Sequence, residues 1–191
     1  MIIAGSSSPD NVAPAEASAI AAELGIEVPC LDMNSACSSF GMQINFLSKM
    51  QPEALPDYIL VADSETLTKC VDYNNRSTAV LFGDGCAAAI VSTKIPSRAI
   101  FLNCHFDSKP SGWVKVGIGY DWYFNQDGNA VQGFAIRQTT ESVKVLQNDY
   151  AAEAKRFVFI GHQANLMMLK TVSERRSIAP ENHWYNVDQF G

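Results

Sequence analysis

The sequence predicts an α/β layered fold, and two segments carry most of that prediction. The run Tyr58–Ala62 is continuously apolar, which is typical of a strand that is covered on both faces. The stretch Ala36–Met50 places the apolar residues Phe40, Ile44 and Leu47 on one face of a helix. Strand-like and helical segments alternate along the chain, and in folds of this class the ligand-binding loops lie at the carboxyl ends of the strands.

The elements before these two segments follow from short apolar runs and helix signals. Ile2–Ala4 is a brief apolar start that predicts a strand. The Ala-rich segment Pro14–Leu24 predicts a helix, with proline in its first turn and Gly25 as its stop. Val28–Met33 predicts a buried strand.

The middle of the chain predicts more strands. Thr78–Phe82 and Cys86–Ser92 are strand-like runs on either side of a glycine turn at Gly83–Gly85, and Ala99–Phe106 is another. The segment 107–127 that follows is irregular and rich in aromatic residues.

In the last part of the chain, predicted helices and strands alternate again. It contains an amphipathic helix, a strand, a second helix and the start of a further element, predicted at Phe134–Tyr150, Arg156–Ile160, Ala164–Arg175 and Trp184–Phe190. Pro96 interrupts the pattern between the strands predicted at Cys86–Ser92 and Ala99–Phe106, so we place a domain boundary there and divide the chain into residues 1–93 and 94–191.

Composition limits the possible classes of protein. The chain has 191 residues, of which 47% are hydrophobic and 18% charged, as expected for a globular protein. A net charge of −6 without a Lys/Arg cluster argues against nucleic-acid binding, and no apolar run is long enough to span a membrane. Five cysteines without regular spacing, no zinc-type Cys/His spacing and no signal peptide favour a metal-free protein of the reducing cytoplasm.

Cys37 is the candidate nucleophile. It lies among small residues at the predicted start of the helix Ala36–Met50, where free backbone N–H groups and the helix dipole would stabilise a thiolate and lower the pKa of the thiol. The same N–H groups could hold an oxyanion. The alternative is a buried cysteine that acts as a small hydrophobic residue, which is the commoner role of a lone cysteine.

His162 is the candidate partner of that thiol. It follows the predicted strand Arg156–Ile160 and precedes Asn165, whose side-chain amide can donate to a carbonyl oxygen. Two neutral donors beside one thiolate would stabilise an enolate or a thioester oxyanion. The alternative is a structural histidine, which is more frequent for a lone residue of this type.

Three strings occur in the order and near the spacing found in one known family. They are Asn34–Gly41 around Cys37, Phe82–Ala88 with its FGDG sequence, and the HQAN sequence His162–Asn165. Together they resemble 3-oxoacyl-[acyl-carrier-protein] synthase III, a thiolase-like condensing enzyme that starts fatty-acid synthesis. The resemblance implies a layered α/β/α/β/α thiolase-like fold, with residues 1–93 in its first half and 94–191 in its second.

The resemblance also implies roles for individual residues. Cys37 would take an acyl group from acyl-CoA as a thioester, and His162 would promote decarboxylation of the malonyl thioester and stabilise the carbanion. The remaining residues would bind CoA or its pantetheine arm. Arg76 would pack on the adenine, Gly128, Asn129 and Asn165 would contact pantetheine, and Phe82 would lie near the acyl pocket. A solvated loop charge at Arg76 and simple core packing at Phe82 remain alternatives.

Two departures from the family qualify this interpretation. The chain is shorter than the family, which suggests a partial chain that is incomplete at both ends, with the third catalytic residue, an asparagine, expected just beyond Gly191. The family typically has an arginine for docking the acidic carrier protein where this chain has Met167. Lys170, one turn further on, could partly replace that charge.

We therefore expect an acyl-CoA-primed condensing enzyme that needs no metal or redox cofactor and forms homodimers through the strand Tyr58–Ala62 and its neighbours. Its acyl carrier protein partner is in doubt because of Met167. One alternative is a related acyltransferase of secondary metabolism with another acceptor, and a second is a non-catalytic partner subunit.

Overall fold

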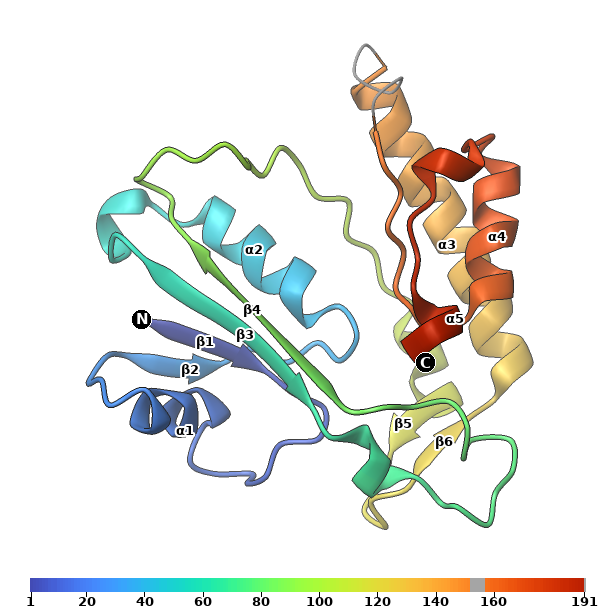
Figure 1. Ribbon diagram of the computed structural model, residues 1–191, viewed down its shortest axis with the longest axis horizontal. Helices are drawn as coiled ribbons and strands as arrows, with labels where there is room; N and C mark the ends of the chain where they lie inside the picture. The colour runs from blue at the N-terminus through green and yellow to red at the C-terminus, as the bar shows by residue number, and fades with distance from the viewer. Residues whose placement is uncertain (152–156, 191) are drawn as a thin grey trace. The chain divides into compact units, whose positions relative to one another are not determined.

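The computed structural model describes residues 1–151 and 157–190, which divide into two compact units. The first unit combines residues 1–69 with 84–104, and the second combines 70–83 with 105–191. The elements of both are labelled in Figure 1. The division at residue 93 concerned the two thiolase-like halves, and it stays a prediction.

The first unit is built on a four-stranded sheet with the strand order β2-β1-β3-β4. The strands β1, β2 and β3 are parallel, and β4 runs antiparallel to β3. Their bounds are Ile2–Gly5 for β1, Cys30–Asp32 for β2, Ile59–Glu65 for β3 and Gly85–Val91 for β4. The strands predicted at 2–4, 28–33, 58–62 and 86–92 are thus confirmed, with small shifts of their ends. The predicted burial of 28–33 is wrong, because β2 lies at an edge of the sheet and its Leu31 is 38% exposed.

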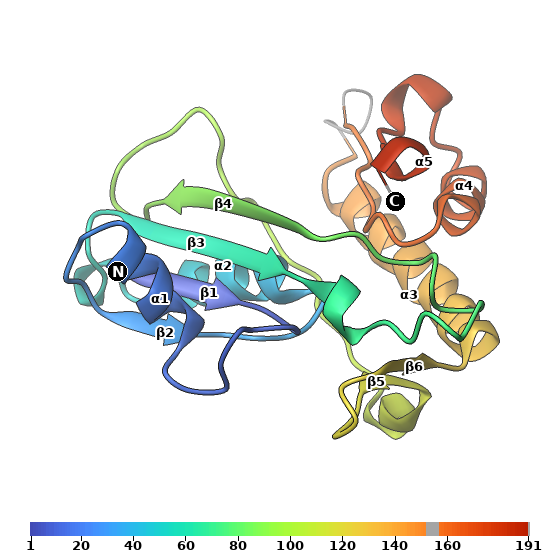
Figure 2. The ribbon, with the colours of Figure 1, turned by 60° about the horizontal axis from the view of Figure 1, so that its bottom comes forward.

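Two helices cover opposite faces of this sheet, as Figure 2 shows. Side chains alternate along a strand, so Ile2 and Ala4 of β1 pack on one face against α1 (Glu16–Glu23), while Ile3 packs on the other. On that second face Leu47 of α2 (Ser39–Lys49) joins the same buried cluster. Gly25 ends the α1 region in the left-handed conformation, with φ of 65°, as its role as a stop predicts.

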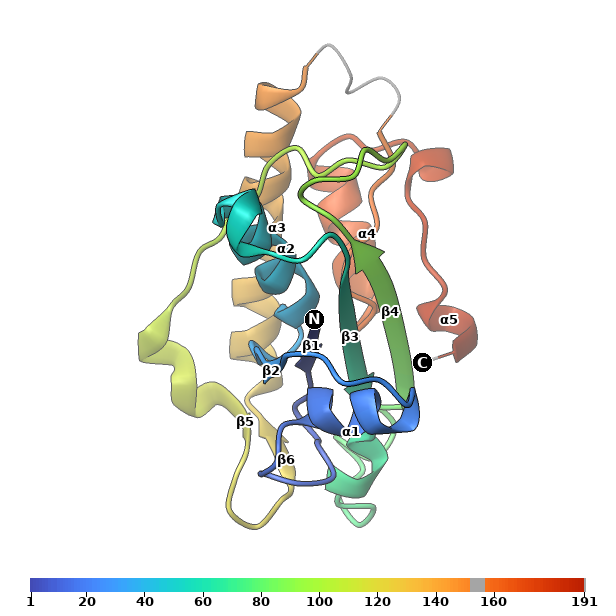
Figure 3. The same ribbon diagram turned by 90° about the vertical axis from the view of Figure 1, so that its left-hand side faces the viewer.

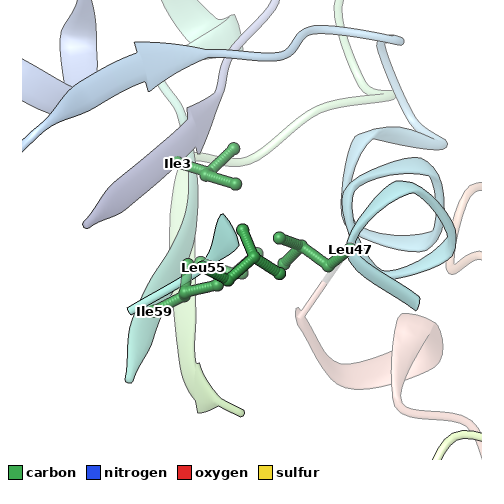
Figure 4. Packing of buried hydrophobic residues seen from close by; sticks show 5 residues of the cluster. Ile3, Leu47, Leu55 and Ile59 are labelled. Carbon is green, nitrogen blue, oxygen red and sulfur yellow. The ribbon is translucent and has the colours of Figure 1, made fainter. Parts of the chain in front are cut away.

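The core beneath α2 contains a cluster of five buried apolar residues. Ile3, Leu47, Leu55, Ile59 and Val61 are each at most 4% exposed, and Figure 4 shows the first four of these side chains meeting between the sheet and the helix. A fully buried side chain of this size contributes roughly 1.5–3 kcal/mol relative to an exposed one. This cluster therefore holds α2 firmly against the sheet.

The second unit contains the helices α3 (Gly128–Asp149), α4 (Leu166–Arg175) and α5 (Val187–Phe190) and the hairpin of β5 (Val116–Ile118) and β6 (Phe124–Gln126). Figure 3 shows α3 and α4 side by side. They enclose an apolar cluster, whose buried members are Val143, Phe159, Leu169, Val172 and Ile178. Both predicted helices are confirmed, although α3 begins six residues before the predicted Phe134.

Two predicted strands are wrong. Thr78–Phe82 forms turns instead, because the carbonyl oxygen of Asn75 accepts from the N–H groups of Thr78 and Ala79 and its side chain accepts from Ser77. Ala99–Phe106 has no regular structure, and it pairs with no strand in the described part of the chain. The hairpin β5–β6, in contrast, lies inside the segment 107–127 that was expected to be irregular.

The predicted strand Arg156–Ile160 is also wrong in the part that the structure describes. Arg156 lies outside the described residues, and among Phe157–Ile160 only Phe159 is paired, through an isolated parallel bridge to His183. The backbone there is held by bonds from Phe159 N to Asn182 O, at 2.7 Å, and from Trp184 N to Phe159 O, at 3.0 Å.

The expected dimer contact at the strand Tyr58–Ala62 and its neighbours stays a prediction, and the sheet order shows which of these strands has a free edge. Because β3 pairs with β1 on one side and with β4 on the other, the strand at Tyr58–Ala62 has no free edge with which to join a second sheet. The edges that remain in this sheet are those of β2 and β4.

Short 3₁₀ helices complete the described elements, at Pro52–Ala54, Leu67–Cys70, Pro110–Lys115 and Pro180–Asn182. Within residues 1–151 and 157–190, no helix combines the length and apolar character that crossing a membrane requires.

Candidate functional site

Cys37 lies in a tight loop between the end of β2 and the start of α2. Asn34 Oδ1 accepts from Ala36 N at 2.8 Å, and the Ser39 hydroxyl accepts from Ser35 N at 2.8 Å and donates to Ala36 O at 2.7 Å. These bonds use the small polar residues around the cysteine to hold the loop. The thiol itself is exposed.

The helix begins later than the sequence predicted. Its first residue is Ser39, and Ala36, which was expected to open it, adopts a φ of 48° instead. That left-handed backbone is unusual for a residue with a Cβ, and such conformations are concentrated at functional sites. Cys37 therefore lies two residues before the helix rather than in its first turn.

The surroundings of Cys37 raise the pKa of its thiol, contrary to the predicted decrease. Although its surface is accessible, crowding by neighbouring protein atoms makes the charged form unfavourable, and this desolvation is the largest cause. The cysteine's own backbone N–H favours the thiolate, and the negative charge of Glu65 opposes it. The thiol therefore needs a proton acceptor to react efficiently at neutral pH.

Replacing Glu65 tests the electrostatic part of this effect. In Glu65→Gln, we expect the pKa of the Cys37 thiol to fall, because a negative charge that disfavours the thiolate is removed. The measurement is the rate of Cys37 alkylation by iodoacetamide as a function of pH, whose midpoint should move to lower pH.

Glu16→Gln is the matched control for that experiment. Glu16 is a carboxylate of the same unit that accepts from the Ser64 hydroxyl at 3.3 Å, and it is not among the groups that shift the thiol. An equal shift of the midpoint in both variants would show that general charge, rather than Glu65, acts on Cys37.

His162 lies in the loop before α4, and its neighbours fix that loop. Gln163 donates through Nε2 to Gly161 O at 2.7 Å and accepts through Oε1 from the backbone N–H groups of Asn186 and Val187, at 2.9 and 3.1 Å. Asn165 accepts through Oδ1 from Met168 N at 3.0 Å and so caps α4. Within the HQAN sequence, Gln163 and Asn165 therefore make the hydrogen bonds that hold the loop around His162.

His162 is exposed, yet crowding by protein atoms lowers the pKa of its imidazole through desolvation. The ring is therefore neutral at pH 7, with one nitrogen that donates and one that accepts. A neutral imidazole of this kind can donate a hydrogen bond to a developing oxyanion.

The other predicted binding residues of the second unit lie on different elements. Gly128 and Asn129 open α3 directly after its N-cap Asp127, and Phe82 packs edge-on against Phe124 of β6 with ring centroids 4.7 Å apart. Arg76 is exposed in the turn region before Phe82. The structure thus brings Phe82 to the strand that leads into Gly128 and Asn129.

A cavity of about 460 Å³ lies beside the start of α3, lined by residues 113–119 and 125–127. Its wall includes the ion pair between Lys115 Nζ and Asp127, at 2.9 Å. Trp113, which is 79% exposed, supplies apolar surface at the same place. This open hollow is thus lined by both polar and apolar groups.

Cys37 belongs to the first compact unit, whereas His162, Asn165, Arg76, Phe82, Gly128 and Asn129 belong to the second. Over the described ranges 1–151 and 157–190, no group of three or more His, Cys, Asp or Glu residues could hold a metal ion.

Sequence reasoning missed the polar residues at the end of β3. Glu65 accepts from Ser7 N at 2.9 Å and from the Ser8 hydroxyl at 2.7 Å, and Asp63 accepts from Gln43 at 3.1 Å. Burial raises the pKa of the Asp63 carboxyl, the bond from Gln43 lowers it and the charge of Glu65 raises it. The available signal was the position of Asp63 and Glu65 directly after the apolar run Tyr58–Ala62.

The FGDG sequence has a structural role. Asp84 accepts from both the N–H and the hydroxyl of Thr68, at 3.0 and 2.8 Å, and thereby fixes the segment that leads into β4. These bonds from Thr68, followed by the charge of Lys69, lower the pKa of the Asp84 carboxyl.

Comparison with known proteins gives consistent matches. Residues 31–110 match the family model for 3-Oxoacyl-[acyl-carrier-protein (ACP)] synthase III. The beta-ketoacyl-[acyl-carrier-protein] synthase III of Xylella fastidiosa is 27% identical over 100% of this chain and 62% of its own length, and synthase III 2 of Lactiplantibacillus plantarum is 30% identical over 100% of this chain and 64% of its own. This chain therefore spans less than two thirds of the length of these relatives.

Solved structures agree with the sequence matches. The crystal structure of 3-oxoacyl-[acyl-carrier-protein] synthase III from Aquifex aeolicus superposes with a TM-score of 0.90 at 24% identity, and it covers 100% of this chain and 62% of that one. The fold is that of the thiolase-like proteins, as the resemblance of the three strings implied. Within that class, the chain is similar to the 3-oxoacyl-[acyl-carrier-protein] synthase III family, whose model it matches over residues 31–110.

Proposed function

We propose that this protein is an acyl-CoA-primed condensing enzyme that forms a 3-oxoacyl thioester. The observation that carries the proposal is the exposed Cys37 thiol, held on a tight loop that follows the carboxyl end of β2, in a chain similar to this family. In α/β folds that edge of the sheet is where ligands bind.

The first half of the reaction is an acyl transfer. The Cys37 thiolate attacks the carbonyl carbon of acyl-CoA, a new C–S bond forms, and the CoA thiolate leaves and takes up a proton. The raised pKa of the thiol makes its deprotonation part of this step. Arg76, Asn165 and the Gly128–Asn129 start of α3 are the proposed contacts of the CoA and pantetheine parts, and Phe82 that of the acyl chain.

The second half is a decarboxylative Claisen condensation. A malonyl thioester loses CO₂, and the electron pair that is left forms a carbanion, stabilised as its enolate. The carbanion attacks the Cys37 thioester, the 3-oxoacyl thioester is released and the thiolate is regenerated. Neutral His162 donates a hydrogen bond to the enolate oxygen in this scheme. Neither half needs a metal or a redox cofactor.

Intact-mass spectrometry with a panel of acyl-CoAs tests the first half. We expect a mass increase of one acyl group on the purified protein, and its complete loss in Cys37→Ala. Cys86→Ala is the matched control, because Cys86 is also an exposed thiol of the first unit, and its variant should keep the adduct. An adduct that survives in Cys37→Ala would contradict the proposed nucleophile.

The acceptor is the part of the proposal for which a second candidate has support. Met167 is 67% exposed on α4, and the nearby Lys170 lies over the ring of Tyr185, at 5.9 Å from its centroid. The position expected to dock an acidic carrier protein thus presents an apolar side chain, and the lysine that could replace the charge already has an aromatic partner. This favours an acyltransferase whose acceptor is not a carrier protein.

Release of CO₂ separates the two candidates. A condensing enzyme releases CO₂ from a malonyl thioester in step with product, whereas transfer of the acyl group to an amine or a hydroxyl releases none. A non-catalytic subunit would show neither product. We also propose that the protein is cytoplasmic and that it forms a homodimer. Sedimentation of the purified protein would test the homodimer.

A further inference from the structure

Gln43 is a polar residue in an apolar place. It lies on the face of α2 that packs against the sheet, where its side chain is 0% exposed. Its Nε2 donates to Met33 O at 3.0 Å and to Asp63 Oδ1 at 3.1 Å, while its Oε1 is buried without a partner. Because both partners are acceptors, only the amide nitrogen can face them.

The two partners of Gln43 lie at the ends of different strands. Met33 directly follows β2, and its N–H donates to Ala4 O of β1 at 2.8 Å. Asp63 of β3 lies opposite Gly5 of β1 in the parallel register. One amide on α2 therefore connects the carboxyl ends of β2 and β3, across β1.

The backbone of Gly5 shows how closely these groups converge. A Cβ at Gly5 would meet Asp63 Oδ1, and it would lie 2.7 Å from both Gln43 Nε2 and the Cβ of Ser39. Only a residue without a side chain leaves room for this approach. The start of α2 is thus held against the ends of the strands by polar contacts as well as by apolar packing.

The hydrogen bond from Gln43 to Met33 O spans the loop that contains Cys37. The loop leaves the sheet at Met33 and enters α2 at Ser39, and the bond from Gln43 to Met33 O joins its two ends. A buried amide with an orphaned oxygen costs free energy that an apolar residue would not. The hydrogen bonds that its nitrogen donates give a physical reason for an amide at this position.

We propose that Gln43 and Asp63 are positioning residues for the nucleophile: Gln43 closes the Cys37 loop, and Asp63 orients the amide of Gln43. This inference rests on the proposed acyl transfer for its effect on rate. The closure of the loop itself follows from the contacts of Gln43 alone.

The test uses Gln43→Leu, which keeps the size of the side chain but removes the donor. We expect the backbone amides of Ser35, Ala36 and Ser38 to exchange hydrogen on the order of tenfold faster, while those of β3 keep their protection. We expect acylation of Cys37 at saturating acyl-CoA to slow on the order of tenfold with an unchanged KM, because the thiol is misplaced rather than the CoA site.

Asp63 supplies a matched pair of variants. Asp63→Ala removes the acceptor and should reproduce both effects in weaker form, whereas Asp63→Asn keeps an oxygen that accepts from Gln43 and should behave like the parent protein. This recovery by the conservative variant is the result that simple loss of packing would not give. The pair also decides the question if Gln43→Leu does not fold.

The two readouts keep this inference apart from the proposed function. If the parent protein accepts no acyl group but Gln43→Leu speeds exchange in the loop, the proposed function fails and the closure stands. If Gln43→Leu and Asp63→Ala leave both exchange and acylation unchanged, the inference is overturned.

Discussion

In His162→Ala, we expect release of CO₂ from a malonyl thioester to fall by about 10²–10³-fold, while the acyl group still forms its adduct on Cys37. Removing one donor to an oxyanion has a cost of this order. The imidazole is neutral at pH 7 because desolvation lowers its pKa, so it acts as a hydrogen-bond donor rather than as a positive charge. Stopped assays that follow CO₂ and acyl adduct separately measure the two steps.

Two variants control this experiment. His105→Ala removes another exposed histidine of the same unit, whose Nδ1 lies 3.0 Å from the Ser142 hydroxyl, and it should leave CO₂ release unchanged. His162→Asn keeps an N–H donor in the loop and should recover part of the rate. Unchanged CO₂ release in His162→Ala would exclude His162 from the reaction.

The sequence predicts the sheet of the first unit well, and its two inner strands, β1 and β3, contain the buried residues that an apolar run predicts. The run Tyr58–Ala62 corresponds to β3, one of the two inner strands of the sheet, and an uninterrupted apolar sequence is typical of a strand whose two faces are covered. The apolar face of Ala36–Met50 likewise predicts α2, since Ile44 and Leu47 do pack on the core. Phe40 of the same predicted face is 50% exposed. The apolar periodicity therefore predicted the helix but not which of its apolar residues are buried.

Two of the three wrong strands, Thr78–Phe82 and Ala99–Phe106, fail for different reasons: the first because of local hydrogen bonds and the second because it has no partner strand among the described residues. Thr78–Phe82 has the apolar content of a strand. The carbonyl and side-chain oxygens of Asn75, however, accept hydrogen bonds from the following residues, and these bonds form turns. A run such as Ala99–Phe106 becomes a strand only if another strand pairs with it, and apolar content contains no information on that pairing.

The candidate site was predicted in its residues but not in its physical state. The motif around Cys37 identified the nucleophile candidate, yet its helix was placed three residues too early and the pKa of its thiol was predicted to fall. Glu65 is distant in sequence, and its charge reaches Cys37 only through the fold. The same is true of the bond from Gln43 to Asp63, which joins residues 20 positions apart.

Gly161→Ala should destabilise the second unit by about 1–3 kcal/mol, the usual cost of forcing an extra methyl group into a packed core. A Cβ at this position would meet the Cδ2 atom of Leu169 and lie 2.9 Å from Cζ of Phe159. Both side chains belong to the buried cluster under α4, with Leu169 only 2% exposed, so neither can move aside easily. Thermal or denaturant unfolding of the variant measures the change.

Gly41→Ala separates this clash from the general effect of adding a methyl group. Gly41 lies in α2, and a Cβ added there would have no atom within 4 Å other than those of its chain neighbours and the nearby helix backbone. Alanine at this position should therefore stabilise the protein by roughly 0.5–1 kcal/mol through its better helix propensity. Opposite signs at the two glycines are therefore expected, and equal stabilities would contradict the packing around Gly161. Since Gly161 immediately precedes His162, the same clash should also displace the imidazole, so CO₂ release by the folded fraction of Gly161→Ala should fall while Cys37 still accepts an acyl group.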